Sequence, residues 1–294
     1  MKRAFLLTAT RNAAKRIPLG LGFALAVTFV QLNATAQEVN LLTANGYAVL
    51  ADTAITAANP SLITGGDVGL SPGGATSITG PITFTSPATI DTTDADALQA
   101  RNDLINAYTT AAGLAVSQTL TDVNLGGLTL TPGVYFFKSS AQLTGTLMLD
   151  DQGNPDAVFV FQIGSTLTTA SDASVVQENV ATGKLATQPG MSVFWQVGSS
   201  ATLGTTTEFV GNILAHDSIT DDGGSTVNGR LLALNAAVTL NNTTINTPPA
   251  EQINANGGGN GGGNAPDTGS TLLLLGTGLA ALFAFGRRFS VSLG

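Results

Sequence analysis

The sequence contains no cysteine among its 294 residues, and only 10% of the residues are charged. The missing cysteines exclude disulfide bonds and thiolate metal sites. The charged fraction lies far below the usual quarter. Aromatic residues make up 6% of the chain, so bulky rings are scarce. The residues that remain are small or β-branched, which favours thin, stacked β layers over a helical globule.

Basic residues are also scarce between the two ends of the chain. Of the eleven, five lie in the first sixteen positions and two are Arg287 and Arg288, which leaves four for the body of a chain with a net charge of −8. A body of this kind cannot form a basic stripe, so we expect no nucleic-acid partner. The single histidine, His216, and the absence of cysteine predict no metal site and no cofactor. We see no pattern of catalytic residues and expect no enzyme.

Residues 1–36 have the pattern of a secretory signal peptide. A basic region precedes an apolar run from Ile17 to Leu32, and the small residues Ala34-Thr35-Ala36 follow. We predict export and cleavage after Ala36. An uncleaved anchor helix is the less favoured reading, because the run is shorter than the ~20 residues that span a membrane comfortably.

The other end of the chain reads as a linker and an anchor. Residues 251–264 are rich in Gly and Asn, which is typical of a flexible linker. Within the tail, residues 265–294, an apolar helix is expected at 271–286. The basic pair Arg287-Arg288 follows it and should halt the segment in the membrane with its end in the cytoplasm.

This tail resembles the exosortase-type sorting tails of bacterial surface proteins, which begin V-P-D-x-G-S-T, although Ala265 stands in place of the valine. The sortase-type L-P-x-T-G tail is the second reading, and a permanent anchor is the third. The sorting readings imply a sorting protease or transpeptidase as partner, transient anchorage in the membrane, and a final place at the cell surface or outside the cell. The motif residues are Pro266, Asp267, Thr268, Gly269 and Ser270.

The body of the chain, residues 37–250, repeats itself with a step of eighteen. Each repeat alternates short apolar runs with Gly, Asn, Asp or Ser corners, which is typical of short strands. One such unit cannot bury its own apolar side, but stacked units close a continuous core. The spacing predicts a three-sided parallel β-solenoid whose inward residues include Phe161, Trp195, Phe209, Ile213, Val227, Leu231 and Ile245.

One segment of the body has helical spacing instead. Apolar residues recur at Leu98, Leu104, Ile105, Tyr108 and Ala111, which predicts a long α-helix over about 94–115 with its N-cap at residue 93. A helix lying along one outer side of the coil would cover this stripe. The preceding region, 41–90, should add rungs and close one end of the coil.

These repeats resemble the microbial ice-binding protein family. The matching stretches include GGDVGLSPG, LGGLTLTPGVYFF, AVFVFQIGSTLTTAS, VFWQVGSSATLG, FVGNILAHDSIT and TVNGRLLALNAAVTL, and they span roughly residues 40–247. The resemblance implies a discontinuous right-handed β-solenoid with one helix alongside. It also implies adsorption to ice through one flat face, with inhibition of ice recrystallisation and thermal hysteresis as consequences.

The family face carries a loose T-A/G-x-T/N motif, and four quartets here are similar to it. They begin at Thr169, Thr205, Gly223 and Asn241, and Thr144-Gly145-Thr146 belongs to the row above. We expect the last three quartets to stack in columns, because they step by eighteen. The ice-binding residues predicted in this way are Thr144, Thr146, Thr169, Ser171, Thr205, Thr206, Thr207, Gly224, Thr226, Asn242 and Thr244.

Asp172 and Glu208 occupy the fourth position of their quartets, and Asp221-Asp222 lies beside the third quartet. Charges are strongly hydrated and disturb an ice-like water layer, so we expect weak to moderate thermal hysteresis together with good inhibition of recrystallisation. The alternative function is a cell-surface adhesin or carbohydrate-binding β-solenoid. Trp195 is expected in the core rather than as a platform for a sugar ring.

Overall fold

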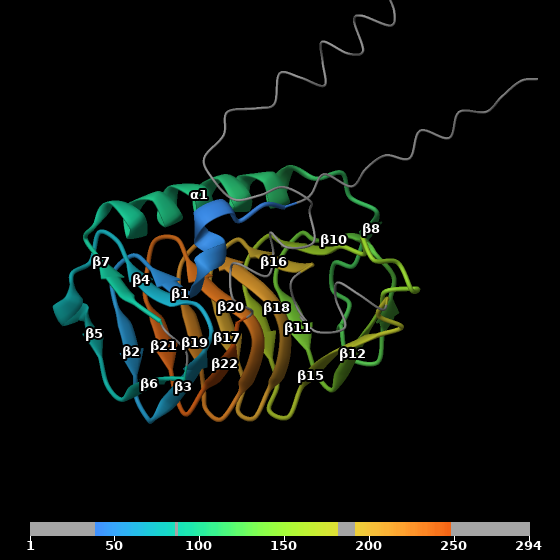
Figure 1. Cartoon of the computed structure of the whole chain (residues 1–294). Coiled ribbons are helices and arrows are strands. Elements are labelled where there is room, and N and C mark those ends of the chain that lie inside the picture. Colours follow the sequence, from blue (N-terminus) through green and yellow to red (C-terminus); the bar gives the residue numbers. More distant parts are fainter. Residues whose placement is uncertain (1–38, 86–87, 182–191, 248–294) are drawn as a thin grey trace, which may run out of the picture. The chain divides into compact units, whose positions relative to one another are not determined.

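Short parallel strands wind around a common axis in the computed structural model, which describes residues 39–85, 88–181 and 192–247 (Figure 1). The predicted signal peptide (1–36), linker (251–264) and sorting tail (265–294) lie outside the described residues. The strands form three faces. Two faces belong to one 15-stranded sheet that bends around a corner, and the third is a separate seven-stranded sheet.

The face that lies under the long helix is called the covered face. Its strands, in order along the stack, are β8 (Gln118–Thr119), β10 (Gly133–Phe137), β13 (Phe159–Ile163), β16 (Val193–Val197), the second halves of β18 (Glu208–Ala215) and β20 (Thr226–Ala233), β1 (Tyr47–Ala51), β4 (Asp67–Leu70) and β7 (Ile90–Thr92).

The other two faces are the seven-stranded face and the third face. The seven-stranded face contains β11 (Ala141–Leu143), β14 (Leu167–Thr169), β17 (Ala201–Leu203), β19 (Ile219–Asp221), β21 (Val238–Leu240), β2 (Ile55–Ala57) and β5 (Ile78–Thr79). The third face contains β9 (Thr129–Leu130), β12 (Thr146–Asp150), β15 (Ser174–Glu178), the first halves of β18 and β20, β22 (Thr244–Asn246), β3 (Ser61–Thr64) and β6 (Ile82–Phe84).

The strand register confirms the repeat of eighteen. Trp195, Ile213 and Leu231 pair in succession across β16, β18 and β20. The rung before them is offset by thirty-four, because Phe161 of β13 pairs with Trp195. All seven residues predicted to point inward are fully buried. The three-sided parallel β-solenoid expected from the sequence is therefore the observed fold.

The order of the rungs along the stack differs from their order in the sequence. The first strands of the chain, β1–β3, pair with β20–β22 from the end of the body. The helix α1 (Ala95–Gly113) then follows β7, and the strands after it begin again at β8, at the opposite end of the stack (Figure 1). The coil is therefore discontinuous, and residues 47–92 add rungs at one end, as expected.

The core inside the coil is lined by buried apolar side chains from all three faces. At its centre the aromatic rings stack from rung to rung: the ring centroids of Phe161 and Trp195 lie 3.9 Å apart, and those of Trp195 and Phe209 lie 5.1 Å apart. The indole Nε1–H donates to the carbonyl of Val210. Trp195 is therefore a core residue, as predicted, and cannot serve as a sugar platform.

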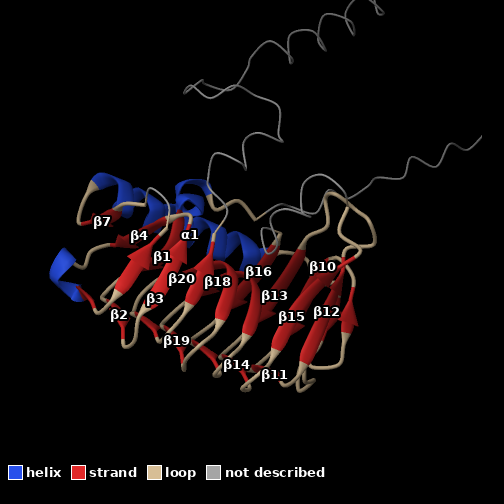
Figure 2. Cartoon of the chain, turned by 60° about the horizontal axis from the view of Figure 1, so that its bottom comes forward, coloured by secondary structure: helices blue, strands red, loops and turns tan. Residues whose placement is uncertain are grey.

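The helix covers the outward side of the covered face, where the rungs carry apolar residues such as Phe194, Leu214 and Leu232 (Figure 2). The predicted apolar stripe was only partly correct. Leu104 and Ala111 are buried, but Leu98 is 51% exposed and Ile105 is 37% exposed. The other buried apolar positions of the helix are small: Ala97, Ala100 and Ala107.

Small residues allow the helix axis to approach the bulky side chains of the sheet closely, so the packed stripe is the one rich in alanine. The spacing of the large apolar residues in the sequence therefore does not identify this stripe. The predicted N-cap was also wrong, because Asp94 caps the helix by accepting from the N–H of Ala97, whereas Thr93 precedes it with a φ of 56°. Within the described ranges, no helix is long and apolar enough to cross a membrane.

Candidate functional site

The seven-stranded face carries a continuous column of threonines. Six of its strands have three residues, and the middle residue points outward between two inward residues, as the alternation of a β-strand requires. The seventh, β5, has two residues, and Thr79 takes the outward position. The pairing of the strands places these middle residues in register. Following the stack, the column reads Gln142, Thr168, Thr202, Thr220, Thr239, Thr56 and Thr79. The six threonines are called the threonine ladder.

The ladder is regular because the strands that carry it are regular. Neighbouring threonines are one strand spacing apart, about 4.8 Å, and each is at least partly exposed. The hydroxyls of Thr56 and Thr79 lie 3.4 Å apart. Among the described residues, the hydroxyls of the other four have no side-chain hydrogen-bond partner. These groups are free to bond to whatever lies against the face.

A second column of small residues flanks the ladder, two positions earlier in each strand segment. Some of its hydroxyls bond to each other across rungs, with 2.8 Å between Thr166 and Ser140 and 3.0 Å between Ser200 and Ser218. The column adds no charge or bulk to the face. It consists of Ser140, Thr166, Ser200, Ser218, Ala237, Ala54 and Ser77.

Beyond Gln142 the flat surface ends. There a depression of about 330 Å³ is lined by residues of the preceding loop, including Asp122 and Asn124, together with Ser139, Ser140 and Gln142. The outward column therefore ends at Gln142 of β11, one strand beyond the last threonine of the ladder.

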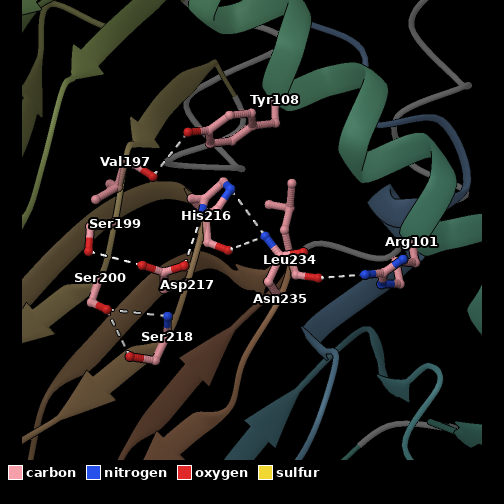
Figure 3. Close-up of polar contacts among 10 residues, drawn as sticks. All are labelled: Arg101, Tyr108, Val197, Ser199, Ser200, His216, Asp217, Ser218, Leu234 and Asn235. Atoms are coloured by element: carbon pink, nitrogen blue, oxygen red, sulfur yellow. Dashed lines mark hydrogen bonds and ion pairs between the residues drawn. The ribbon is translucent and has the colours of Figure 1, made fainter.

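The corner between the covered face and the seven-stranded face is held by polar contacts, shown in Figure 3. Successive rungs are linked where Ser199 donates to Asp217 and where the Asn235 side chain donates to the carbonyl of His216. The side chains of His216 and Asp217 are also in contact, at 2.8 Å.

The helix is fastened to the same corner. The Tyr108 hydroxyl lies 3.4 Å from the carbonyl of Val197, and Arg101 donates to the carbonyl of Leu234 (Figure 3). Arg101 also forms an ion pair with Asp52. Such contacts hold one long edge of the seven-stranded face at a constant position from rung to rung. The ladder therefore rests on a rigid support.

The carboxyl of Asp217 has hydrogen-bonding partners on both sides at this corner. The hydrogen bonds from His216 and then Ser199 hold the pKa of this carboxyl below its ordinary value. The group is therefore ionised at neutral pH and lies at the edge of the face rather than on it.

The predicted quartets lie at the opposite corner, between the seven-stranded face and the third face. The last three quartets stack as expected. Their fourth residues pair in succession, since Glu208 pairs with Thr226 and Thr226 pairs with Thr244. Asp172, Thr206 and Asn242 have left-handed backbones with φ of 52–58°, and Gly224 has a φ of 74°. These quartets therefore form tight turns rather than the middle of a flat face.

Two of the predicted ice-binding residues do not reach the surface, which corrects their placement. Thr169 is 3% exposed and Thr207 is 0% exposed, because their hydroxyls lie 2.8 Å apart beneath the corner. Thr169 also accepts from the N–H of Gly204. The quartet that begins at Thr169 is two residues out of register with the others, since Thr169 is the last residue of β14 and the others begin in the turn.

The remaining predicted residues divide between the turn and the third face. The turn holds Thr144, Ser171, Thr205, Thr206, Gly224 and Asn242. Several of its hydroxyls are already bonded, since Thr205 donates to Ser171 at 2.7 Å and Thr206 donates to Asp172 at 2.5 Å. On the third face, Thr146, Thr226 and Thr244 belong to one column with Ser174, Glu208 and Leu62.

The acidic residues of the quartets point in different directions. Asp172, Glu208 and Asp222 are exposed at the turn or on the third face. Asp221 is 1% exposed and points into the corner, where it accepts from the hydroxyls of Ser225 and Thr243. No acidic side chain belongs to the column of the threonine ladder.

The step of eighteen in the sequence does not reveal the ladder. Thr202 and Thr220 keep this step, but Thr239 follows Thr220 by nineteen, and Thr56 and Thr79 stack from the other end of the chain. The signal that could have found it is local: a threonine between two inward residues, in ATL, ITD, VTL and ITA. Among the residues that the structure describes, no three His, Cys, Asp or Glu side chains gather as ligands for a metal.

Comparison with known protein families gives two matches. A profile described as ice-binding-like matches residues 49–246, and a VPDSG-CTERM motif matches residues 266–289. The chain belongs to the ice-binding-like family. The resemblance inferred from the repeats and the exosortase-type reading of the tail are thereby confirmed.

Relatives of similar length carry the same family name. The ice-binding protein of Nostoc sp. (strain HG1) is 45% identical over 266 residues, which are 88% of this chain and 91% of the relative. The ice-binding protein of Flavobacterium frigoris (strain PS1) is 34% identical, over 73% of this chain and 78% of the relative.

Solved structures agree in fold. The crystal structure of an ice-binding protein from an Antarctic biological consortium is 41% identical with a TM-score of 0.67, and the match covers 77% of this chain and 99% of that one. The structure of LeIBP, an ice-binding protein with antifreeze activity from an Arctic yeast, is 31% identical with a TM-score of 0.64, over 72% of this chain and 94% of that one.

Proposed function

We propose that the protein binds ice and that the threonine ladder of the seven-stranded face is the contact surface. The observation that carries the proposal is the register of six outward threonines on six successive strands, with no charged residue in their column. The exposed turn residues of the predicted quartets border this contact. They are Thr144, Ser171, Thr205, Thr206, Gly224 and Asn242.

Threonine suits contact with a crystal of water. Its methyl group can enter a gap of the lattice and its hydroxyl can join the ordered water, while the β-branched side chain has little rotamer freedom to lose. A rigid sheet can hold water near lattice positions before contact, which lowers the ordering cost of binding. Each contact is weak, but six that engage together make release slow.

We infer weak to moderate thermal hysteresis together with inhibition of ice recrystallisation. The ladder itself is uncharged, but Asp222 and Asp172 lie at the turn beside it and are exposed. Their hydration shells compete with an ice-like layer along one long edge of the face. The contact is also narrow, since one threonine per strand is presented.

The function is binding rather than catalysis, and the C-terminal motif supports action at or beyond the cell surface. We infer that residues 1–36 direct export and that the tail of the VPDSG-CTERM type is processed by an exosortase-like enzyme. Both segments lie outside the described residues.

The test compares ice with polysaccharide as the ligand of the purified body and its linker, residues 37–264. We expect this protein to shape a single ice crystal, to slow the coarsening of ice grains, and to stay in solution when insoluble polysaccharides are sedimented. Unshaped crystals and unchanged coarsening would overturn the proposal. Co-sedimentation with polysaccharide in the same preparation would favour the carbohydrate-binding adhesin.

A further inference from the structure

The direction in which the chain leaves the body bears on how the protein is used. Thr247, the last described residue, is 4% exposed and follows β22 of the third face. Its N–H donates to the carbonyl of Thr64 at 2.7 Å, and its hydroxyl donates to the carbonyl of Gly229 at 2.8 Å. The end of the body is therefore held in place by two rungs.

Gly229, the partner of Thr247, lies at a corner of the coil. β20 passes from the third face to the covered face at this glycine, since Asn228 pairs with β22 and Leu231 pairs with β1. In a three-sided coil, the corner between the third face and the covered face lies opposite the seven-stranded face. Thr247 thus lies on the side of the body away from the threonine ladder.

The other end of the body leaves from the covered side as well. Val39 and Leu41 are 3% and 4% exposed and pack in the cluster that lies between the helix and the covered face. Asp103 of the helix accepts from the N–H and the hydroxyl of Thr43, which fixes this segment against the helix. Neither end of the described body emerges on the seven-stranded face.

The sequence between the body and the sorting motif is short. Residues 248–265 separate Thr247 from the start of the motif match at residue 266. A chain of eighteen residues spans at most roughly 60 Å. A body held by its tail would thus stay close to the envelope, with its orientation deciding which face is free.

We propose that the protein, while held at its C-terminal end, is an ice adhesin that attaches the cell envelope to an ice surface. This inference rests on the proposed function, because the seven-stranded face must bind ice. Because Thr247 lies on the opposite side of the body, the attached form presents the seven-stranded face away from the envelope. One partner is crystalline ice, and the other is the envelope surface reached through the tail.

The absence of cysteine allows a clean test with single-cysteine variants of residues 37–264. In one solved structure of an ice-binding protein, the match to this chain covers 99% of the solved chain. A body of this kind therefore folds without further domains. Three coupling points are compared: a cysteine added after residue 264, Asn102→Cys on the exposed side of the helix, and Ala58→Cys, two residues after Thr56 on the side of the ladder. Each variant is coupled to beads through a short linker.

The readout is the number of beads that stay on an ice surface under flow. Beads coupled after residue 264 or at Asn102 should hold at least about tenfold more often than beads coupled at Ala58, since many proteins per bead engage together. Equal adhesion in all three orientations would overturn the proposal, as would failure of the beads coupled after residue 264.

The same three proteins are also measured uncoupled, by their retention in growing ice. Retention of the free proteins without adhesion of the beads coupled after residue 264 rejects the adhesin and leaves the ice-binding function standing. Exclusion of all three free proteins from ice rejects both proposals together.

Discussion

The seven-stranded face and the third face are built from the same rungs, yet they present different surfaces. Across the seven-stranded face the ladder has a threonine on six successive strands, and four of these hydroxyls have no side-chain partner among the described residues. On the third face the matching column is interrupted by Glu208 and Leu62. The hydroxyls of Thr146 and Ser174 are bonded to each other at 2.8 Å.

The difference shows that threonine content alone does not make a contact surface for a lattice. Within the described residues, the seven-stranded face combines free hydroxyls, an unbroken column and the absence of charge, and the third face does not. The third face has hydroxyls, but it also carries amide pairs such as Asn246 and Asn228, which bond to each other at 3.0 Å. The predictions that follow alter one face and use the other as the control.

The largest effect is expected when four ladder threonines are removed together. Replacing Thr168, Thr202, Thr220 and Thr239 with Ala should raise the protein concentration needed to slow grain coarsening by more than about tenfold, because many weak contacts are lost at once. The control replaces Thr146, Ser174, Thr226 and Thr244 of the third face with Ala, and should change this concentration less than about twofold. A similar loss in both variants would mean that the two faces do not differ.

A smaller gain is expected when the charge at the edge of the ladder is removed. Asp222→Ser should raise thermal hysteresis by roughly two- to threefold, because a hydration shell that competes with ice-like water disappears. The matched control is Asp156→Ser, in an exposed turn at the far end of the third face. Equal hysteresis in Asp222→Ser and wild type would show that the edge charge does not limit activity.

A still smaller gain is expected when the ladder is extended at β11. Gln142→Thr continues the column by one strand and should increase retention in ice by less than about twofold, since one contact joins six. Retention is measured by partition into growing ice, with melting temperature as the control for folding. A loss of retention would indicate that the face ends before β11.

The smallest effect is expected when the charged residue in the third-face column is replaced by threonine. Glu208→Thr restores a hydroxyl between Ser174 and Thr226 in that column. Grain coarsening should stay within about 1.5-fold of wild type, because the proposed contact surface is the seven-stranded face. A strong gain would reveal a second ice-binding face.

Much of the fold could be predicted because the repeat and the inward residues are visible in the sequence. The spacing of Phe161, Trp195 and Ile213 in the sequence indicates the successive rungs. Because the rungs stack, these residues pair across neighbouring strands. The packed stripe of the helix could not be read in the same way. Its alanines carry no hydropathic signal as strong as that of Leu98, which is exposed.

The site was harder to predict than the fold. A motif that steps by eighteen led to the turn residues, and the turn conformation of Thr206 and Asn242 is set by stacking rather than by the motif. Thr207 is hidden because its hydroxyl has a buried partner, which no pattern of residue types reveals. The ladder joins strands from both ends of the chain, so it exists only once the discontinuous coil has closed.

The most direct test of the threonine ladder is the partition of two tyrosine variants between growing ice and the remaining liquid. Thr220 and Thr226 are six residues apart, on different faces, and both are partly exposed. Thr220→Tyr should be excluded from ice, because one bulky ring holds the whole flat face away from the lattice, and Thr226→Tyr should enter ice as the wild type does. Equal retention of both variants, or exclusion of Thr226→Tyr alone, would contradict the assignment of the ladder as the ice-binding surface.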